Sequence, residues 1–302
     1  GTMALAIEGR PDRDTAIRTI HAGLDAGVRY LDTAWSYYLP SELAPASEDL
    51  GYGEKLVRDA LASWNGPRDA VLVATKTGYR RTCEAVAATD GTYAVGADES
   101  RPQSQRLQAE GSRYGWIADS RPETMIRDAK ESALHLGVDT LDLLYSHGPD
   151  PAVPYETNAA REQLLDEGVI KYAGISRVNN EQIDLARGII GSGLVAVQNQ
   201  FSPSHPDPEH TMEHCAELGL AFVCWSPLGG FLDTFDQSAY DPFRTVAAQR
   251  GCSYQRVVLA WELTRYERLF TIPSARNPQE INDSFAATQL QLTQEELAML
   301  PC

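Results

Sequence analysis

Seven short apolar segments, each followed by a longer amphipathic stretch, constrain the fold of this chain more than any other feature. Short apolar runs bounded by turn residues are typical of buried strands, and longer stretches with a period of 3.6 residues are typical of helices. The predicted strands cover residues 30–34, 71–77, 141–147, 172–176, 195–201, 221–225 and 269–273. The predicted helices cover residues 12–26, 50–63, 122–136, 156–168, 179–190, 207–218, 243–266 and 278–288.

This alternation predicts an α/β protein in which helices surround a parallel sheet. The length of 302 residues is close to that of a single (β/α)8 barrel, also called a TIM barrel. Only seven strands are visible, so we expect the first barrel strand to be truncated or to start at residue 1. We predict one domain over residues 1–302.

One segment, residues 78–119, departs from this alternation of strands and helices, because it is polar and its apolar residues show no clear periodicity. A structureless segment of about 40 residues is unusual inside a compact domain and tends to be functional or disordered. Counted with the missing first strand, it follows the third barrel strand. We therefore expect a loop insertion on the C-terminal face, where barrels build their sites. A shorter insertion, residues 39–48, also follows a strand.

The composition excludes several classes of partner. A formal net charge of −16 repels nucleic acid and anionic lipid, so neither is an expected partner. No apolar run of about 18 residues and no basic leader are visible, so no membrane span or secretory signal is predicted. Five cysteines without a C-x-x-C spacing favour a reduced, cytoplasmic protein.

Three predicted strands end in ionisable residues, namely Asp32, Lys76 and His147. Burial of an unpaired charge is expensive, and the carboxyl ends of parallel barrel strands meet at one rim. We therefore expect one shared site in which Asp32 pairs with Lys76. A lysine that reaches solvent, an aspartate that only caps a turn and a buried structural histidine remain the alternatives.

Tyr37 lies five residues after Asp32 and is a candidate general acid. An ammonium within hydrogen-bond reach favours the phenolate, so Lys76 should lower the pKa of Tyr37 below its usual value near 10. The adjacent Tyr38 competes for the same role.

Several motifs together resemble the aldo-keto reductase family over nearly the whole chain, with residues 78–119 as the main exception. The three signatures are Asp32-Thr33-Ala34-x-x-Tyr37, Ala74-Thr75-Lys76-Thr77-Gly78 and Asp142-Leu143-Leu144-Tyr145-Ser146-His147. Further matches are residues 171–176, 197–202, 225–230 and 272–276, and residues 1–3 resemble the end of the family's first strand.

The resemblance implies a barrel that binds a nicotinamide dinucleotide without a Rossmann domain. It also implies a catalytic tetrad, which here is Asp32, Tyr37, Lys76 and His147. Hydride would pass to a carbonyl carbon while Tyr37 protonates the oxygen. Lys76, held by Asp32, would tune Tyr37, and His147 would orient the carbonyl of a small-molecule aldehyde or ketone, or of the alcohol in reverse.

The resemblance further implies a row of cofactor contacts. Ser176 and Gln198 would hold the carboxamide, Trp225 would stack on the nicotinamide, and Arg276 would bind a 2′-phosphate. This favours NADPH, although Glu280 suits a ribose diol and keeps NADH possible. The full set is Gly1, Thr2, Met3, Asp32, Ser176, Arg177, Gln198, Trp225, Ser226, Pro227, Leu228, Gly229, Gly230, Ser274, Arg276, Glu280, Asp283 and Ser284.

Two departures from the family pattern affect different parts of the expected site. Arg177 stands where asparagine usually follows the serine, so one contact to the cofactor carboxamide is expected to be lost, and Tyr38 stands where glycine is usual, next to the substrate. We expect Trp35, Tyr38 and Phe231, with Met3, to line an apolar pocket that suits hydrophobic carbonyls or sugars.

Two other functions remain open at this stage. Residues 210–214 match the H-x-x-E-H pattern of inverted zinc proteases, but they lie in a predicted outer helix. Relatives of the resembled family also include cofactor-binding regulatory subunits, so a redox sensor with little turnover is the alternative to an enzyme.

Overall fold

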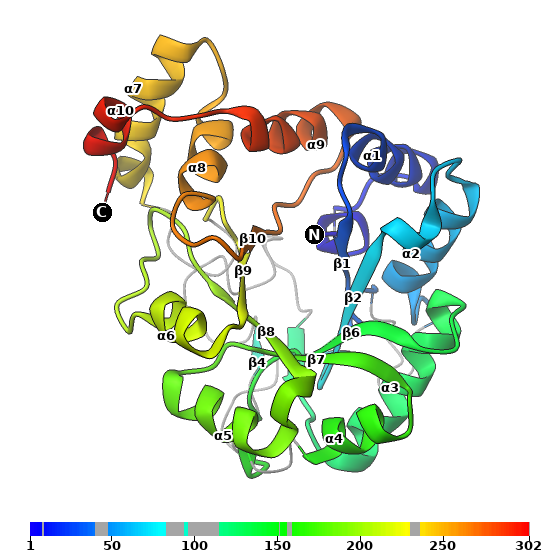
Figure 1. Ribbon diagram of the computed structural model, residues 1–302. Coiled ribbons are helices and arrows are strands. Elements are labelled where there is room, and N and C mark those ends of the chain that lie inside the picture. Colours follow the sequence, from blue (N-terminus) through cyan, green and yellow to red (C-terminus); the bar gives the residue numbers. More distant parts are fainter. Residues whose placement is uncertain are drawn as a thin grey trace.

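The central feature is a sheet of seven parallel strands that curls around an axis, with helices outside it (Figure 1). The computed structural model describes residues 1–7, 9–39, 48–82, 94–95, 115–150, 152–155, 159–229 and 236–301. In spatial order the strands are β1 (Tyr30–Asp32), β2 (Leu72–Thr77), β6 (Leu141–Ser146), β7 (Ile170–Ser176), β8 (Leu194–Gln200), β9 (Ala221–Trp225) and β10 (Leu269–Thr271). This order confirms the predicted barrel architecture, and each strand lies within three residues of its predicted ends.

Residues 1 and 2 lie between the two edge strands, β10 and β1. The amino group of Gly1 donates to the Pro273 carbonyl oxygen at 3.0 Å, and the Thr2 amide donates to the Asp32 carbonyl oxygen at 2.9 Å. Among the described residues no strand precedes β1, because the chain turns at once into the 3₁₀ helix η1 (Met3–Leu5).

Ten α-helices are described, and most follow a strand and pack against the outside of the sheet (Figure 1). They are α1 (Arg13–Ala26), α2 (Tyr52–Ser63), α3 (Pro122–Leu136), α4 (Ala159–Asp166), α5 (Asn180–Ile190), α6 (Thr211–Leu218), α7 (Asp241–Arg250), α8 (Tyr254–Glu262), α9 (Pro278–Phe285) and α10 (Gln294–Met299). Within these ranges no helix is long and apolar enough to cross a membrane.

The predicted helix 243–266 is wrong in one respect, because it is two helices. Gly251 ends α7 with a φ of 62°, a left-handed conformation that glycine adopts without a Cβ clash. The Ser253 hydroxyl then accepts a hydrogen bond from the Arg256 amide and begins α8.

A second sheet follows β2 directly and has the antiparallel order β3 (Tyr79–Thr82), β5 (Gly115–Ala118), β4 (Ala94–Val95). The insertion therefore has the predicted position but contains strands where we expected a loop. Tyr79 and Trp116 are buried and pack against Ala34 and Tyr37, so this sheet covers the rim beside the end of β1. Residues 83–93 and 96–114 of the insertion, and residues 40–47 of the shorter one, lie outside the described residues.

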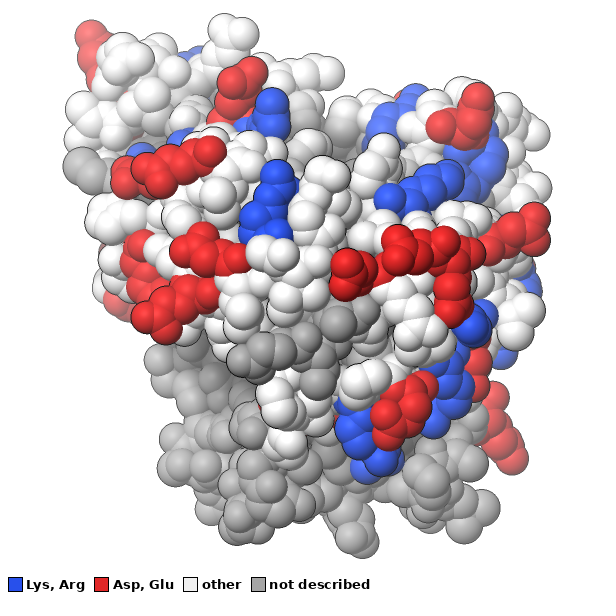
Figure 2. Space-filling view, turned by 60° about the horizontal axis from the view of Figure 1, so that its bottom comes forward, with Lys and Arg blue, Asp and Glu red and all other residues white. Residues whose placement is uncertain are grey.

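The surface is acidic but not uniformly so. Figure 2 shows acidic and basic side chains interspersed over the described part of one face. Charged side chains of the described residues also form ion pairs, such as Lys171 with Asp142 at 2.6 Å. Exposed pairs of this kind add little stability, so the net charge acts mainly through the long-range field.

Candidate active site

The ends of β1 and β2 bring Asp32 and Lys76 together beneath the rim. Parallel pairing places Asp32 beside Ala74 and Lys76 beside Tyr145, so both side chains lie at the carboxyl edge. The Lys76 ammonium forms a salt bridge with Asp32 Oδ1, and both side chains are 1% exposed. It also donates to the Thr33 carbonyl oxygen at 2.8 Å and to Tyr37 Oη at 3.4 Å. These partners satisfy the buried ammonium, as its burial requires.

Burial and this cation act in opposite directions on Tyr37. Burial raises the pKa of the Tyr37 phenol, the Lys76 ammonium lowers it, and the balance lies above the usual value. The expected direction of the Lys76 effect is therefore present, but the expected net lowering of the Tyr37 pKa is wrong. Burial also lowers the pKa of Lys76, yet Asp32 and Tyr37 outweigh that effect and the net pKa is raised. Tyr37 is accordingly a neutral phenol beside a charged lysine at neutral pH.

His147 follows β6 and lies across from Tyr37, with their rings edge-on and 5.7 Å apart. Burial, assisted by the positive charges of Lys76 and Arg177, places the pKa of His147 well below its usual value. The imidazole is therefore neutral near pH 7, and Ser36 Oγ lies 3.3 Å from its Nδ1. A neutral imidazole has one N–H donor, which suits a hydrogen bond to a carbonyl oxygen.

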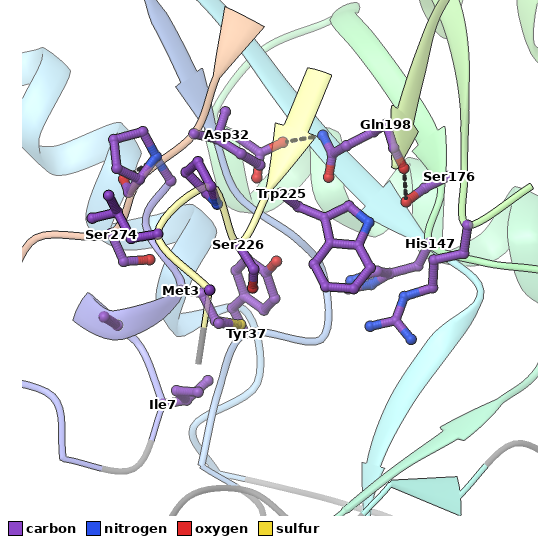
Figure 3. A pocket seen from close by; sticks show the side chains of 18 of the residues that line it. Met3, Ile7, Asp32, Tyr37, His147, Ser176, Gln198, Trp225, Ser226 and Ser274 are labelled. Carbon is purple, nitrogen blue, oxygen red and sulfur yellow. Dashed lines mark hydrogen bonds between the residues drawn. The ribbon is translucent and has the colours of Figure 1, made fainter. Parts of the chain in front are cut away.

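Side chains from two further strands, β8 and β7, form a hydrogen-bond chain that ends on Asp32 (Figure 3). Gln198 on β8 donates from Nε2 to Asp32 Oδ2 at 2.9 Å, and Ser176 on β7 donates from Oγ to the Gln198 carbonyl oxygen at 2.6 Å. The second carboxylate oxygen of Asp32 is thus also satisfied. This network fixes the carboxylate that holds Lys76.

A cavity of about 480 Å³ opens above these groups and extends from the tetrad to the start of α9. Figure 3 shows His147 and Trp225 on one side of the view, Ser274 on the other, and Tyr37 between them. The predicted site residues that line it are Gly1, Met3, Asp32, Tyr37, His147, Ser176, Arg177, Gln198, Trp225, Ser226, Pro227, Leu228, Gly229, Ser274, Arg276 and Glu280.

Some predicted site residues do not line this cavity. Lys76 lies beneath it, Thr2 binds the Asp32 carbonyl oxygen through Oγ1 at 3.0 Å, and Ser284 is not at its wall. Asp283 pairs with Arg256 on α8. Gly230 and Phe231 lie outside the described residues.

Trp35 and Tyr38, the predicted substrate contacts, are buried and also absent from the cavity wall. Trp35 Nε1 donates to Glu131 Oε2 on α3 at 3.0 Å, and Tyr38 Oη accepts from the Arg81 amide at 3.2 Å. Their rings meet edge-on at 5.8 Å. This placement supports a role in holding the rim together rather than direct contact with substrate.

Tyr79 and Trp116 line the cavity and were not predicted from the sequence. Tyr79 stacks on His147 at 4.8 Å with an interplanar angle of 16°. The sequence could have indicated Tyr79, because it comes only three residues after Lys76 and therefore lies near the same rim. The nonlocal pairing of β3 with β5, which brings Trp116 to the same wall, has no such signal.

The far end of the cavity is formed by the turn after β9 and by the start of α9. Ser226 and Gly229 have left-handed backbones, and the Gly229 amide donates to the Ser226 carbonyl oxygen at 2.8 Å. Glu280 folds back, so that its Oε2 accepts from the Arg276 amide at 2.7 Å and its Oε1 accepts from Asn277 Nδ2 at 2.7 Å.

This cavity fits an extended dinucleotide. Trp225 offers a flat face, and its buried Nε1 has no hydrogen-bond partner among the described residues. The same wall also contains the tight turn that includes Gly229. It further contains Arg276, whose side chain is exposed. Such donors suit a pyrophosphate in a protein that lacks a general positive field.

The H-x-x-E-H segment shows no metal site. His214 Nε2 lies 2.8 Å from Asp184 Oδ1 on the neighbouring helix, and His210 is largely exposed. No cluster of three metal-ligating side chains occurs among the described residues.

The model of the Aldo/keto reductase family matches residues 1–301. The chain belongs to this family. It is therefore an oxidoreductase of the family that acts on carbonyl compounds and alcohols with a nicotinamide cofactor.

Three relatives illustrate the likeness. Pyridoxine 4-dehydrogenase of Escherichia coli is 26% identical, with 99% of this chain and 92% of that protein aligned. The 6-dehydroglucose reductase of Novosphingobium aromaticivorans is 25% identical, with 98% and 87% aligned. The crystal structure of a Bombyx mori aldo-keto reductase in complex with NADP has a TM-score of 0.65 and 20% identity, over 95% of this chain and 82% of that one. None of the three is named as a regulatory subunit, so the sensor alternative gains no support.

Proposed function

We propose that this aldo-keto reductase converts an aldehyde or ketone to the alcohol, or the reverse, with Tyr37 as proton donor and NADPH as the preferred cofactor. The observation that carries the proposal is the position of Lys76. Its ammonium lies between the Asp32 carboxylate and the Tyr37 hydroxyl, while Tyr37 and His147 both face the cavity.

The tetrad residues have separate tasks in this proposal. Tyr37 holds its proton until the carbonyl oxygen gains charge, and the adjacent Lys76 then stabilises the phenolate that remains. The Asp32 carboxylate keeps Lys76 charged and in place. His147, as a neutral donor, orients the carbonyl oxygen towards Tyr37. In alcohol oxidation Tyr37 accepts the proton in its phenolate form.

The cofactor, when bound, supplies or accepts the hydride. Trp225 would lie against the nicotinamide, Ser176 and Gln198 would orient its carboxamide, and the turn from Ser226 to Gly229 would hold the pyrophosphate. Arg276 would pair with a 2′-phosphate, because guanidinium and phosphate form strong charge-assisted hydrogen bonds. NADP in the Bombyx mori relative supports this preference.

Replacement of Tyr37 by phenylalanine tests the proposal most simply. Positioned acids contribute about 10² to 10⁴ in rate, so kcat for reduction of an aldehyde panel should fall by at least 10²-fold. The affinity for NADPH, measured by fluorescence titration, should stay within about twofold because the ring is kept. Full reductase activity in the variant would remove Tyr37 from the reaction.

A further inference from the structure

The imidazole of His147 lies in a fixed plane. Tyr79 stacks on one face with ring centres 4.8 Å apart and an interplanar angle of 16°, and Tyr37 lies edge-on with ring centres 5.7 Å apart. The next residue, Gly148, allows this stacking, because a Cβ there would collide with the Tyr79 ring. The His147 amide donates to the Thr77 carbonyl oxygen at 2.9 Å. The surrounding structure therefore sets both the backbone and the ring plane of His147.

A fixed plane does not decide which edge of the imidazole faces the cavity. A half-turn about the Cβ–Cγ bond keeps the ring in the same plane, yet it exchanges each ring nitrogen with a carbon atom. Stacking tolerates both orientations, because it depends only on the ring face. A hydrogen bond to one ring nitrogen distinguishes the two orientations, because a ring carbon cannot replace the nitrogen in that bond.

Ser36 supplies a hydrogen bond of this kind. Its Oγ lies 3.3 Å from His147 Nδ1, and Ser36 is 0% exposed. Ser36 directly precedes Tyr37 in the chain but is absent from the cavity wall, whereas His147 lines it. Ser36 is therefore placed to act on the reaction through His147 rather than through contact with a substrate.

The hydrogen-bonding capacity of the two side chains indicates where the ring proton lies. His147 is neutral near pH 7, because burial places its pKa well below the usual value. If Nδ1 carried the proton, it would donate to Ser36 Oγ, and the hydroxyl proton would have no acceptor among the described residues. If the Ser36 hydroxyl donates to a bare Nδ1 instead, both groups are satisfied and the ring proton lies on Nε2. An unsatisfied buried donor is costly, so the second arrangement is favoured.

We propose that Ser36 is a positioning residue that holds His147 as the Nε2–H tautomer with Nε2 towards the cavity. This inference rests on the proposed function, in which His147 donates to the carbonyl oxygen, and it names the residue that keeps this donor available. Within the described part of the chain no protein atom binds Nε2. The N–H bond to the carbonyl strengthens as the oxygen gains charge, so it contributes more in the transition state than in the ground state.

The nitrogen NMR spectrum of His147 tests the tautomer directly. In proton–nitrogen correlation spectra of protein labelled with nitrogen-15 histidine, a protonated ring nitrogen and a bare one have well-separated shifts. The variant His147→Asn lacks the signal and so identifies it among the six histidines. At neutral pH with saturating oxidised cofactor, the wild-type protein should show a bare Nδ1 and a protonated Nε2. A protonated Nδ1 would overturn the inference.

Replacement of Ser36 by alanine removes the donor to Nδ1. The flipped ring and the other tautomer should then become populated, which appears as a shifted or second His147 signal. The value of kcat/KM for reduction of an aldehyde panel should fall roughly 3- to 10-fold, as expected for one neutral hydrogen bond, and mostly through kcat. The affinity for NADPH should stay within about twofold. An unchanged His147 spectrum in Ser36→Ala would overturn the inference.

Ser132→Ala is the matched control. Ser132 on α3 is also 0% exposed, and its Oγ has no hydrogen-bond partner among the described residues. This variant removes another buried hydroxyl and should leave both the His147 spectrum and kcat/KM unchanged. A spectral change and a loss equal to those of Ser36→Ala would refute a specific role of Ser36. Absence of turnover with every aldehyde would count against the proposed function alone, because the spectra report the tautomer without turnover.

Discussion

The two ends of the cavity hold their charged groups in different ways. At the tetrad end, Lys76 and Asp32 are 1% exposed, and each has several fixed hydrogen-bond partners. At the α9 end, Arg276 and Glu280 are exposed, and the partners of Glu280 among the described residues belong to its own turn. The difference follows from the task, because proton transfer needs a fixed field whereas binding of a flexible nucleotide tolerates adjustment.

The largest effect should come from Lys76→Met, which removes the cation from the buried end. Among the described residues Asp32 would keep one side-chain partner, Gln198, and would remain buried, so the free energy of unfolding should fall by about 3–5 kcal/mol. Denaturant titration measures this change. The double variant with Asp32→Asn should recover part of the loss, since the uncompensated charge is gone. Equal stability of Lys76→Met and wild type would mean that the pair is not buried as described.

A smaller effect should come from Arg276→Ala at the exposed end. The affinity for NADPH should fall roughly 10-fold and that for NADH less than about twofold, because only NADPH carries the 2′-phosphate. Fluorescence titration with both cofactors measures the two losses. The free energy of unfolding should hardly change, which is the contrast with Lys76. Equal weakening of both cofactors would exclude Arg276 from 2′-phosphate recognition.

The same contrast explains what the sequence could predict. Asp32, Lys76 and His147 end apolar strands, and the parallel order of a barrel leaves them only one rim on which to meet. Their convergence follows from burial and topology. The cofactor contacts predicted near α9 rest on the family resemblance alone. An exposed arginine such as Arg276 needs no buried partner, so the sequence pattern does not constrain where it lies.

Other features depend on contacts that no local pattern encodes. Tyr37 and Tyr38 are adjacent, and the turn in which the Tyr37 amide donates to the Ala34 carbonyl oxygen at 3.1 Å decides which ring faces the cavity. Tyr79 and Trp116 depend on pairing across a long segment. The net pKa of Tyr37 is a balance between burial and a cation, and the sequence shows only the cation.

The pH dependence of carbonyl reduction by the wild-type protein tests the central claim, that Tyr37 donates the proton, most directly. A donor acts only while protonated, so the rate is lost as pH rises through its pKa. Burial raises the pKa of Tyr37 above its usual value, and burial places the pKa of His147 well below its usual value. With deuterated cofactor used to verify that hydride transfer limits the rate, kcat should stay level from about pH 6 to 9. A tenfold fall per pH unit across that range would contradict Tyr37 as the donor.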